Sequence, residues 1–393
     1  MKEFSTKYMY DNEWTEKASK FFSKDHIEKT KPYVVKVKNG IILPERPGNL
    51  PWGLGGCLDE AGNLIPESTV NGAYGGKYNF DENSIEKLDE TVVLIPMIPK
   101  HWGHFIIDVI SRLWIFLDDR FDTKNLKIYY CAFGWGEKKL SGNYLRFMEY
   151  LGIADRLIQV DHPIQAKEVW VPSFTMSYRI SCNEEYKVPV EYVIQKVLAS
   201  DKVKNLEPYE KIYFTRTHFA TSQLKEIGEI DIEKTMQSNG YHILSPEKLS
   251  FEEQIYYIHQ CKVMMAMSGT ITHNIVFSNP EMKLYIINRT CVPNPPQLLL
   301  NRLYENEIYF VDAYRENTLK HPKDYGFGPF WVTTNENFQN FCKDHQITIP
   351  DEILHHSRMH DWQKYEYALA VFNAKYNKFT IFVYYKMKKI LGR

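Results

Sequence analysis

The sequence has few cysteines, and none of them forms a pattern that points to a metal site or a disulfide framework. Six cysteines are scattered over 393 residues without a C-x-x-C motif. Structural zinc sites and disulfide-stabilised folds usually need closely spaced cysteines, so neither is indicated. This cysteine usage fits a reducing compartment, and we therefore expect a cytoplasmic protein.

Long apolar runs and a strong excess of one charge are also absent. No stretch approaches the roughly 20 apolar residues that span a membrane, and Met1–Trp14 carries charges where a signal peptide needs an apolar core. The formal net charge is -1, whereas binding to a nucleic-acid backbone usually needs a broad basic face. We therefore predict neither an integral membrane protein nor a nucleic-acid-binding protein.

The tail Lys375–Arg393 differs from the rest of the chain in charge. It contains six lysine or arginine residues, no acidic residue and the apolar stretch Phe379–Tyr385. A basic amphipathic segment of this kind can rest on an anionic membrane surface, which here predicts peripheral contact at the inner face of the membrane. A terminal helix packed on the folded domains is the alternative.

The remaining composition is that of an ordinary globular protein with more than one domain. Hydrophobic residues make up 44% and charged residues 25% of the chain, which supplies ample material for cores. A single core stops growing at roughly 250 to 300 residues, so 393 residues favour two domains with a cleft between them.

The order of predicted elements divides the chain into four parts. Residues 1–90 read as short strands and glycine-rich turns, a β-rich preamble. Residues 91–205 and 206–335 each alternate buried-type strands with helices, which predicts βαβ units and parallel sheets in two α/β domains. Residues 336–393 read as a helical tail that packs back on the domains. The expected strands are 91–96, 126–131, 157–160, 168–171, 211–215, 241–244, 263–267 and 283–287, and the expected helices are 104–117, 143–151, 189–199, 232–239, 250–260 and 270–277.

A histidine and a carboxylate share one face of the first predicted helix. His104 and Asp108 are four residues apart, which places them side by side on a helix. A carboxylate can hold an imidazole in one tautomer and leave its other nitrogen as a proton acceptor. The pair therefore predicts acid–base chemistry. A structural pair that caps or solvates the helix is the alternative.

Residues 263–277 are predicted to form a strand, a turn of small residues and the start of a helix, in that order. The free backbone N–H groups of such a helix start favour a diphosphate. The turn is neither a P-loop nor a G-x-G-x-x-G fingerprint, so nucleotide hydrolysis and redox-cofactor binding lose support. A helix cap without a ligand is the alternative. The residues expected to contribute are Ser268, Gly269, Thr270, His273 and Asn274.

Two further positions are candidates for nucleotide contact. Arg216 ends the predicted strand 211–215, at the edge of a parallel sheet where ligands bind, and an arginine there suits a phosphate clamp. An ion pair with Glu226 or Glu229 is the competing explanation. Glu253 lies in the first turn of helix 250–260, where its carboxylate can accept a ribose hydroxyl or complete a capping box with Ser250.

Several short motifs, each weak alone, occur together in one order. They are Gly55-Gly56-Cys57-Leu58-Asp59, Trp102-Gly103-His104-Phe105 with Asp108, Arg112-Leu113-Trp114, Tyr213-Phe214-Thr215-Arg216, Gly228-Glu229, Leu249-Ser250-Phe251-Glu252-Glu253-Gln254, and Ser268-Gly269-Thr270 with His273-Asn274. This set resembles glycosyltransferase family 61, from about residue 55 to residue 290. The family often has His or Glu in place of Ser268 and Asn in place of Gly228, so backbone contacts at Gly269 and Thr270 are the firmer expectation.

The resemblance implies a GT-B-like fold of two Rossmann-like domains that face a cleft. It also implies inverting transfer of a sugar from a nucleotide sugar, with UDP as the expected carrier, to a glycan or lipid-linked glycan acceptor. For bacterial members of this size it implies capsule, lipopolysaccharide or exopolysaccharide synthesis. The N-terminal domain then holds the acceptor and the base His104, oriented by Asp108, and the C-terminal domain holds the donor.

No D-x-D motif stands where a metal-dependent transferase needs one, so neither a metal nor another cofactor is expected. Two other functions stay open. One is another nucleotide-sugar enzyme, such as an epimerase. The other is a non-catalytic polysaccharide-assembly protein in which His104 and Asp108 are structural.

Overall fold

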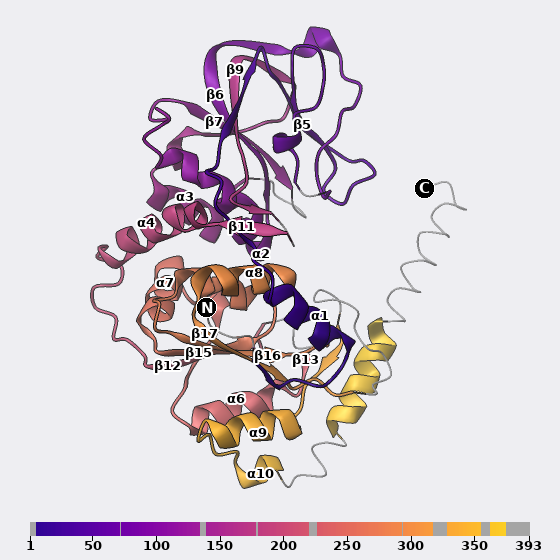
Figure 1. Cartoon of the computed structure of the whole chain (residues 1–393), viewed down its shortest axis with the longest axis vertical. Coiled ribbons are helices and arrows are strands. Elements are labelled where there is room, and N and C mark those ends of the chain that lie inside the picture. Colours follow the sequence, from indigo (N-terminus) through magenta and orange to yellow (C-terminus); the bar gives the residue numbers. More distant parts are fainter. Residues whose placement is uncertain are drawn as a thin grey trace.

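The structure, a computed structural model, describes residues 5–70, 72–133, 139–177, 180–219, 226–292, 294–316, 328–354 and 362–374. Two sheets dominate it, one above the other in Figure 1, with a layer of helices between them. The tail Lys375–Arg393, predicted to contact a membrane, lies outside the described residues.

The upper sheet has a parallel centre and antiparallel additions. Its strand order is β5-β4-β9-β6-β7-β8, with β3 also paired to β9. Strands β9, β6, β7 and β8 run parallel, whereas β3, β4 and β5 join antiparallel. The strands are β3 (Val34–Lys38), β4 (Ile41–Arg46), β5 (Leu54–Leu58), β6 (Glu86–Pro99), β7 (Lys127–Phe133), β8 (Leu157–Gln159) and β9 (Ile164–Pro172).

The strands expected in the preamble, residues 1–90, do not form a layer of their own. β3 and β4 pair with β9, and β5 pairs with β4, so they extend the upper sheet. The start of the chain instead crosses to the lower sheet, where β1 (Ser5–Tyr8) pairs with β17 (Glu307–Asp312). Helix α1 (Glu13–Phe22) then packs against α8 (Pro295–Tyr304).

The lower sheet is fully parallel in the described part of the chain. Its order is β1-β17-β16-β15-β12-β14. The remaining strands are β12 (Lys211–Phe214), β14 (His242–Leu244), β15 (Val263–Met267) and β16 (Lys283–Asn288). Since β12 lies between β14 and β15, the order reverses there. Ligands of open α/β sheets bind outside the carboxyl ends of the strands at such a point.

Helices cover both faces of the lower sheet. Between the sheets lie α3 (Gly142–Leu151), α4 (Lys187–Leu198), α7 (Phe251–Gln260), the 3₁₀ helix Thr270–Phe277 and α8. Below it lie α6 (Glu229–Ser238), α9 (Glu336–Asp344) and α10 (Asp351–Leu354). Side chains of β15 alternate between these layers: Met264 and Ala266 join the core between the sheets, and Met265 and Met267 join the core below.

Smaller elements complete the described structure. β10 (Met176–Ser177), β11 (Ser181–Asn183) and β2 (Ile27–Glu28) form a short sheet, and β13 (Glu226–Ile227) pairs with β18 (Phe330–Trp331). Residues 362–374 form a further helix.

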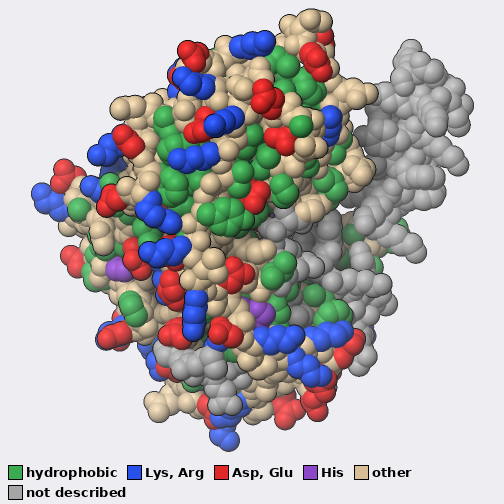
Figure 2. All heavy atoms as spheres, turned by 45° about the horizontal axis from the view of Figure 1, so that its top comes forward, with side chains coloured by type: hydrophobic (Ala, Val, Ile, Leu, Met, Phe, Trp, Pro, Cys, Tyr) green, Lys and Arg blue, Asp and Glu red, His purple; other side chains and the backbone are tan. Residues whose placement is uncertain are grey.

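The α/β class with parallel strands and covering helices is confirmed, and the GT-B assignment stays a prediction. Among the described residues, no helix combines the length and the apolar character needed to cross a bilayer. On the face drawn in Figure 2, blue Lys and Arg side chains are interspersed with red Asp and Glu side chains. That face carries no broad basic area among the described residues.

Candidate functional site

A cavity of about 740 Å³ lies between the two halves of the molecule. The chain segments that follow β12, β15 and β16 open onto it, which is the edge of the lower sheet where the strand order reverses. Both halves supply its lining: His101, Trp102, His104 and Asn143 from above, and Arg216, Thr270, His273 and Arg289 from below. A ligand here would therefore contact both halves.

His104 and Asp108 lie on the upper wall, on an irregular helix. The segment starts as α2 (Trp102–His104), continues as a π-helix over Phe105–Val109 and ends as a 3₁₀ helix over Ile110–Phe116. The helix predicted over 104–117 is therefore present but changes its pitch. Single π turns occur frequently at functional sites.

The two side chains are hydrogen-bonded as the sequence predicts. His104 Nδ1 lies 2.9 Å from Asp108 Oδ2. The Asp108 side chain is 3% exposed, whereas that of His104 is 34% exposed and lines the cavity. An ionised carboxylate only accepts, so it holds the proton of a neutral imidazole on Nδ1, and in that tautomer Nε2 is an acceptor. The Trp52 ring stands edge-on to the imidazole with centroids 4.5 Å apart, which restricts its rotation.

A buried arginine offsets the buried charge of Asp108. Arg112 is 1% exposed, and burial lowers its pKa to about 9, while the neighbouring charge of Asp108 acts in the opposite direction. Its guanidinium donates to the carbonyl groups of Pro172 and Thr69 and lies 3.7 Å from the centre of the Phe174 ring. These fixed contacts hold the positive charge close to the His104–Asp108 pair.

The turn after β15 presents backbone to the cavity. Gly269 has φ of 141°, a conformation that favours glycine, and a Cβ there would lie 3.1 Å from Arg289 Nη2. The 3₁₀ helix Thr270–Phe277 begins directly after it. The Thr272 amide donates to the Gly269 carbonyl at 3.1 Å, whereas the amides of Thr270 and Ile271 precede the first carbonyl that a helix of this pitch can offer. Ser268 is 4% exposed and does not line the cavity. Its hydroxyl accepts from the Arg289 amide at 3.4 Å, so a direct side-chain contact to a ligand has no support.

His273 and Asn274 follow on the same helix, and both line the cavity. Asn294 Nδ2 donates to His273 Nε2 at 3.2 Å. Burial, with smaller contributions from His104 and His101, lowers the pKa of His273 to about 3. His273 is therefore neutral at physiological pH and offers hydrogen bonds rather than charge.

Contacts beside this helix join the two halves of the molecule. Asn274 Oδ1 accepts from Trp102 Nε1 at 2.8 Å. Gly103 packs closely on the same helix, because a Cβ there would lie only 3.0 Å from Thr270 Oγ1. The Trp102-Gly103-His104 motif therefore fixes the position of the upper wall relative to the turn below.

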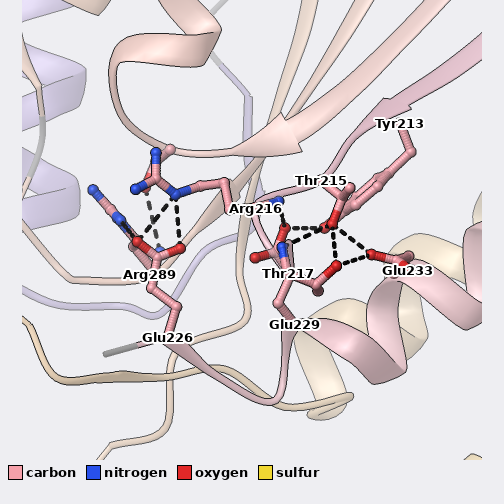
Figure 3. Close-up of polar contacts among 9 residues, drawn as sticks. Tyr213, Thr215, Arg216, Thr217, Glu226, Glu229, Glu233 and Arg289 are labelled. Carbon is pink, nitrogen blue, oxygen red and sulfur yellow. Dashed lines mark hydrogen bonds and ion pairs between the residues drawn. The ribbon is translucent and has the colours of Figure 1, made fainter. Parts of the chain in front are cut away.

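Two arginines share one carboxylate on the lower wall (Figure 3). Arg216 Nε lies 3.0 and 2.8 Å from the two carboxylate oxygens of Glu226, and Arg289 Nη1 bonds to the same carboxylate. The Glu226 side chain is 5% exposed, and all three residues line the cavity. The ion pair between Arg216 and Glu226, which is the alternative to a phosphate clamp, is therefore formed. It lies at the cavity wall where the clamp is predicted.

Arg289 is not among the predicted site residues, although a signal for it exists. It follows β16 directly, as Arg216 follows β12 within two residues, and both reach the same edge of the sheet. A search for arginines at the carboxyl ends of all predicted parallel strands finds both.

Buried carboxylates fix the turn that carries Arg216 (Figure 3). Glu229 accepts from the Tyr213 hydroxyl at 3.1 Å and from the Arg216 amide at 2.9 Å. Burial raises the pKa of Glu229 to about 8. Glu233 accepts from the hydroxyls of Thr215 and Thr217 at 2.5 and 2.6 Å. The backbone on both sides of Arg216 is therefore held in place.

Glu253 has a structural role instead of the predicted contact with ribose. Its carboxylate accepts from the Ser250 amide at 2.7 Å, and the Ser250 hydroxyl accepts from the Glu253 amide, which completes the capping box of α7. Glu253 does not line the cavity, whereas Glu247 and Gln254 do. The capping alternative accounts for Glu253, and the ribose role has no support.

Potential metal ligands are not grouped in the described part of the chain. No three His, Cys, Asp or Glu side chains there are arranged to hold an ion. Independence from metal stays a prediction.

The geometry describes an α/β protein with a binding cavity between two sheets, a histidine–carboxylate pair on one wall and cations on the other. Residues 102–285 match the sequence profile of the family Glycosyltransferase 61. This match supports the resemblance and a glycosyltransferase activity, and the matched range contains His104, Asp108, Arg216 and the turn after β15. No curated protein matches the chain.

Proposed function

We propose that the chain is an inverting glycosyltransferase that moves a sugar from a nucleotide sugar, with UDP as the expected carrier, to a glycan or lipid-linked glycan. The observation that carries this proposal is the opposition across one cavity of His104 and the arginines Arg216 and Arg289. A base and an anion site belong on opposite sides of the anomeric carbon in a direct displacement.

These positions support the following reaction. The acceptor hydroxyl attacks the anomeric carbon and gives its proton to His104 Nε2, while the bond from that carbon to the diphosphate oxygen breaks. The pair of electrons leaves with the diphosphate. Arg216, Arg289 and the amides at Thr270 offset the charge that develops there, and preorganised donors stabilise the transition state more than the ground state. Attack from the face opposite the leaving group inverts the configuration.

Synthesis of capsule, lipopolysaccharide or exopolysaccharide in a bacterial cytoplasm is part of the proposal, supported by the family resemblance alone. An epimerase would need the same diphosphate site, but it would release an isomerised nucleotide sugar instead of a glycosylated acceptor. A polysaccharide-assembly protein without catalysis would bind no nucleotide.

A thermal-shift screen with a panel of nucleoside diphosphates and nucleotide sugars tests the proposal. A ligand at about 100 times its dissociation constant adds ~2.7 kcal/mol of stability, which is readily measured as a rise in Tm. We expect one nucleotide class to stabilise the protein. A flat response across the whole panel contradicts the proposed function.

A further inference from the structure

The side-chain amide of Gln254, near the start of α7, has its orientation fixed by the backbone around it. Its Nε2 donates to the carbonyl groups of Pro246 and Leu249 at 3.0 and 3.2 Å. Carbonyl oxygens only accept, so Nε2 must face them and Oε1 must face the other way. Gln254 is 9% exposed and lines the cavity. Within the described part of the chain, Oε1 makes no hydrogen bond and is not shut off from solvent. A ligand in the cavity therefore meets an acceptor that is already oriented.

The strand order of the lower sheet shows at which end of the cavity Gln254 lies. Residues that follow four neighbouring strands line the cavity, in the order Arg289 after β16, Gly269 after β15, Arg216 after β12 and Pro246 after β14. The wall that carries His104 rests on the segment after β15, because Gly103 packs against Thr270. Gln254 is bonded to Pro246, so it lies beyond Arg216, on the side away from that segment.

The charges of the lining decide which part of a nucleotide sugar each end takes. In the proposed reaction the diphosphate lies beside Arg216 and Arg289 (Figure 3), and the sugar has to reach His104. These two arginines are the cations among the described lining residues, whereas the end after β14 presents the carboxylate of Glu247. A carboxylate repels a phosphate. The uncharged nucleoside is therefore the part of the donor that fits the end with Gln254.

Phe219 adds an aromatic ring to the same end of the cavity. Its amide donates to the Arg216 carbonyl at 3.0 Å, and the residue is 40% exposed and lines the cavity. The turns after β12 and β14 start side by side, because the Thr215 amide donates to the Leu244 carbonyl at 2.9 Å. Aromatic rings are surfaces on which bases stack, and a fixed acceptor can read the edge of a stacked base.

We propose that Gln254 determines which base the donor carries, because its Oε1 accepts from the ring N–H of uracil or guanine. Uracil N3 and guanine N1 carry a hydrogen. The corresponding ring nitrogen of cytosine or adenine is an acceptor and would face the lone pairs of Oε1. A site built around a hydrogen bond rejects a ligand that leaves its polar group unpaired. This inference rests on the proposed function, since it assigns the base of the proposed nucleotide donor.

Titration calorimetry on the full chain tests the proposal. The affinities of UDP and GDP are compared with those of CDP and ADP. The tighter of the first two is then compared with its ring-methylated analogue, N3-methyl-UDP or N1-methyl-GDP. We expect methylation to weaken binding to the wild type at least about tenfold, because it removes the donor and leaves Oε1 unpaired. In Gln254→Met, which has similar length but no amide, the same methylation should change affinity less than about twofold.

Asn279→Leu is the matched control. Asn279 also donates to two backbone carbonyls, those of His259 and Cys261 at the other end of α7, but it does not line the cavity. This variant should discriminate against the methylated nucleotide as strongly as the wild type. A loss confined to Gln254→Met is then not a general effect of loosening α7.

Equal affinity of the wild type for the methylated and unmethylated nucleotides overturns the proposal, and this comparison decides even if Gln254→Met does not fold. Full discrimination by a folded Gln254→Met also overturns it, because another group then reads the base. A preference for CDP or ADP overturns it as well but leaves the proposed transferase intact. Binding of no nucleotide at all contradicts the proposed function itself.

Discussion

Arg216 and Arg289 come from the ends of two different strands, and the carboxylate of Glu226 binds both of them at the cavity wall. Neither arginine is held by this carboxylate alone, because the Arg216 amide also donates to Glu229 and the Arg289 amide to the Ser268 hydroxyl. The arrangement gives two guanidinium groups a defined separation before any ligand arrives. Preorganised cations of this kind suit a diphosphate, whose charge is spread over several oxygens.

Each arginine should therefore contribute separately to diphosphate affinity. We expect Arg216→Ala and Arg289→Ala each to weaken nucleoside-diphosphate binding by roughly 1.5 to 3 kcal/mol, the usual contribution of a charge-assisted hydrogen bond. Isothermal titration calorimetry measures this directly. Arg120→Ala is the matched control, since Arg120 pairs with Asp118 outside the cavity. Unchanged affinity in both folded cavity variants would refute the clamp.

The shared carboxylate also predicts how the two substitutions combine in stability. Either single variant leaves Glu226 with one cation, but the double variant leaves a buried carboxylate without its two partners. An uncompensated buried charge costs about 3 to 5 kcal/mol. The double variant should thus lose more stability in urea unfolding than the sum of the single variants, and adding Glu226→Gln should restore much of the loss. Strict additivity would mean that Glu226 does not couple the two arginines.

Because the imidazole of His273 is neutral in the folded protein, we expect this residue to contribute to the loss of folding stability at low pH. Its pKa is about 3 in the folded chain and 6.5 without the burial. Between these values the unfolded chain binds a proton that the folded chain does not, so stability falls as the pH falls, by at most about 1.4 kcal/mol per pH unit. The unfolding free energies of the wild type and of His273→Asn, measured at several pH values, isolate the contribution of His273. We expect the difference in their unfolding free energies to change between pH 6.5 and pH 3, and a constant difference would exclude a buried neutral His273.

Chelation tests the expectation that no metal is needed. In the proposed donor site, the amides after β15 and the two arginines would offset the diphosphate charge without an ion. We therefore expect turnover to persist in EDTA. Loss of turnover that one divalent cation restores would reveal a metal requirement and contradict this expectation.

Local patterns in the sequence predict much of the fold. The strand predicted at 263–267 is β15, Val263–Met267, because its apolar run is bounded by clear turn residues. The capping box of Ser250 and Glu253 marks the start of α7. The pairing of β1 with β17 joins residues some 300 positions apart, and no local pattern reports such a contact. The change from α to π to 3₁₀ pitch after His104 depends in the same way on tertiary packing.

The candidate site is predictable to a similar degree. The contact between His104 and Asp108 follows from their helical spacing, and the places of Arg216 and of the turn after β15 at the cavity follow from their positions at strand ends. Their functional roles rest on the family resemblance. A first-turn carboxylate such as Glu253 fits two roles, a ribose contact and a capping box, and only the contacts of the folded chain favour the cap. The roles of Glu226 and Arg289 depend on contacts between segments that are separate in the sequence.

The central claim is that His104 is the base of a sugar transfer whose donor lies on the opposite wall. The most direct measurement is turnover of His104→Ala with the donor found in the nucleotide screen, together with the affinity of the variant for that donor. Loss of a general base typically lowers the rate by about 10² to 10⁴-fold, so we expect such a loss in kcat with donor affinity retained, and a smaller or similar loss in Asp108→Asn. Near-normal turnover in both variants would contradict the account and leave the pair with a structural role.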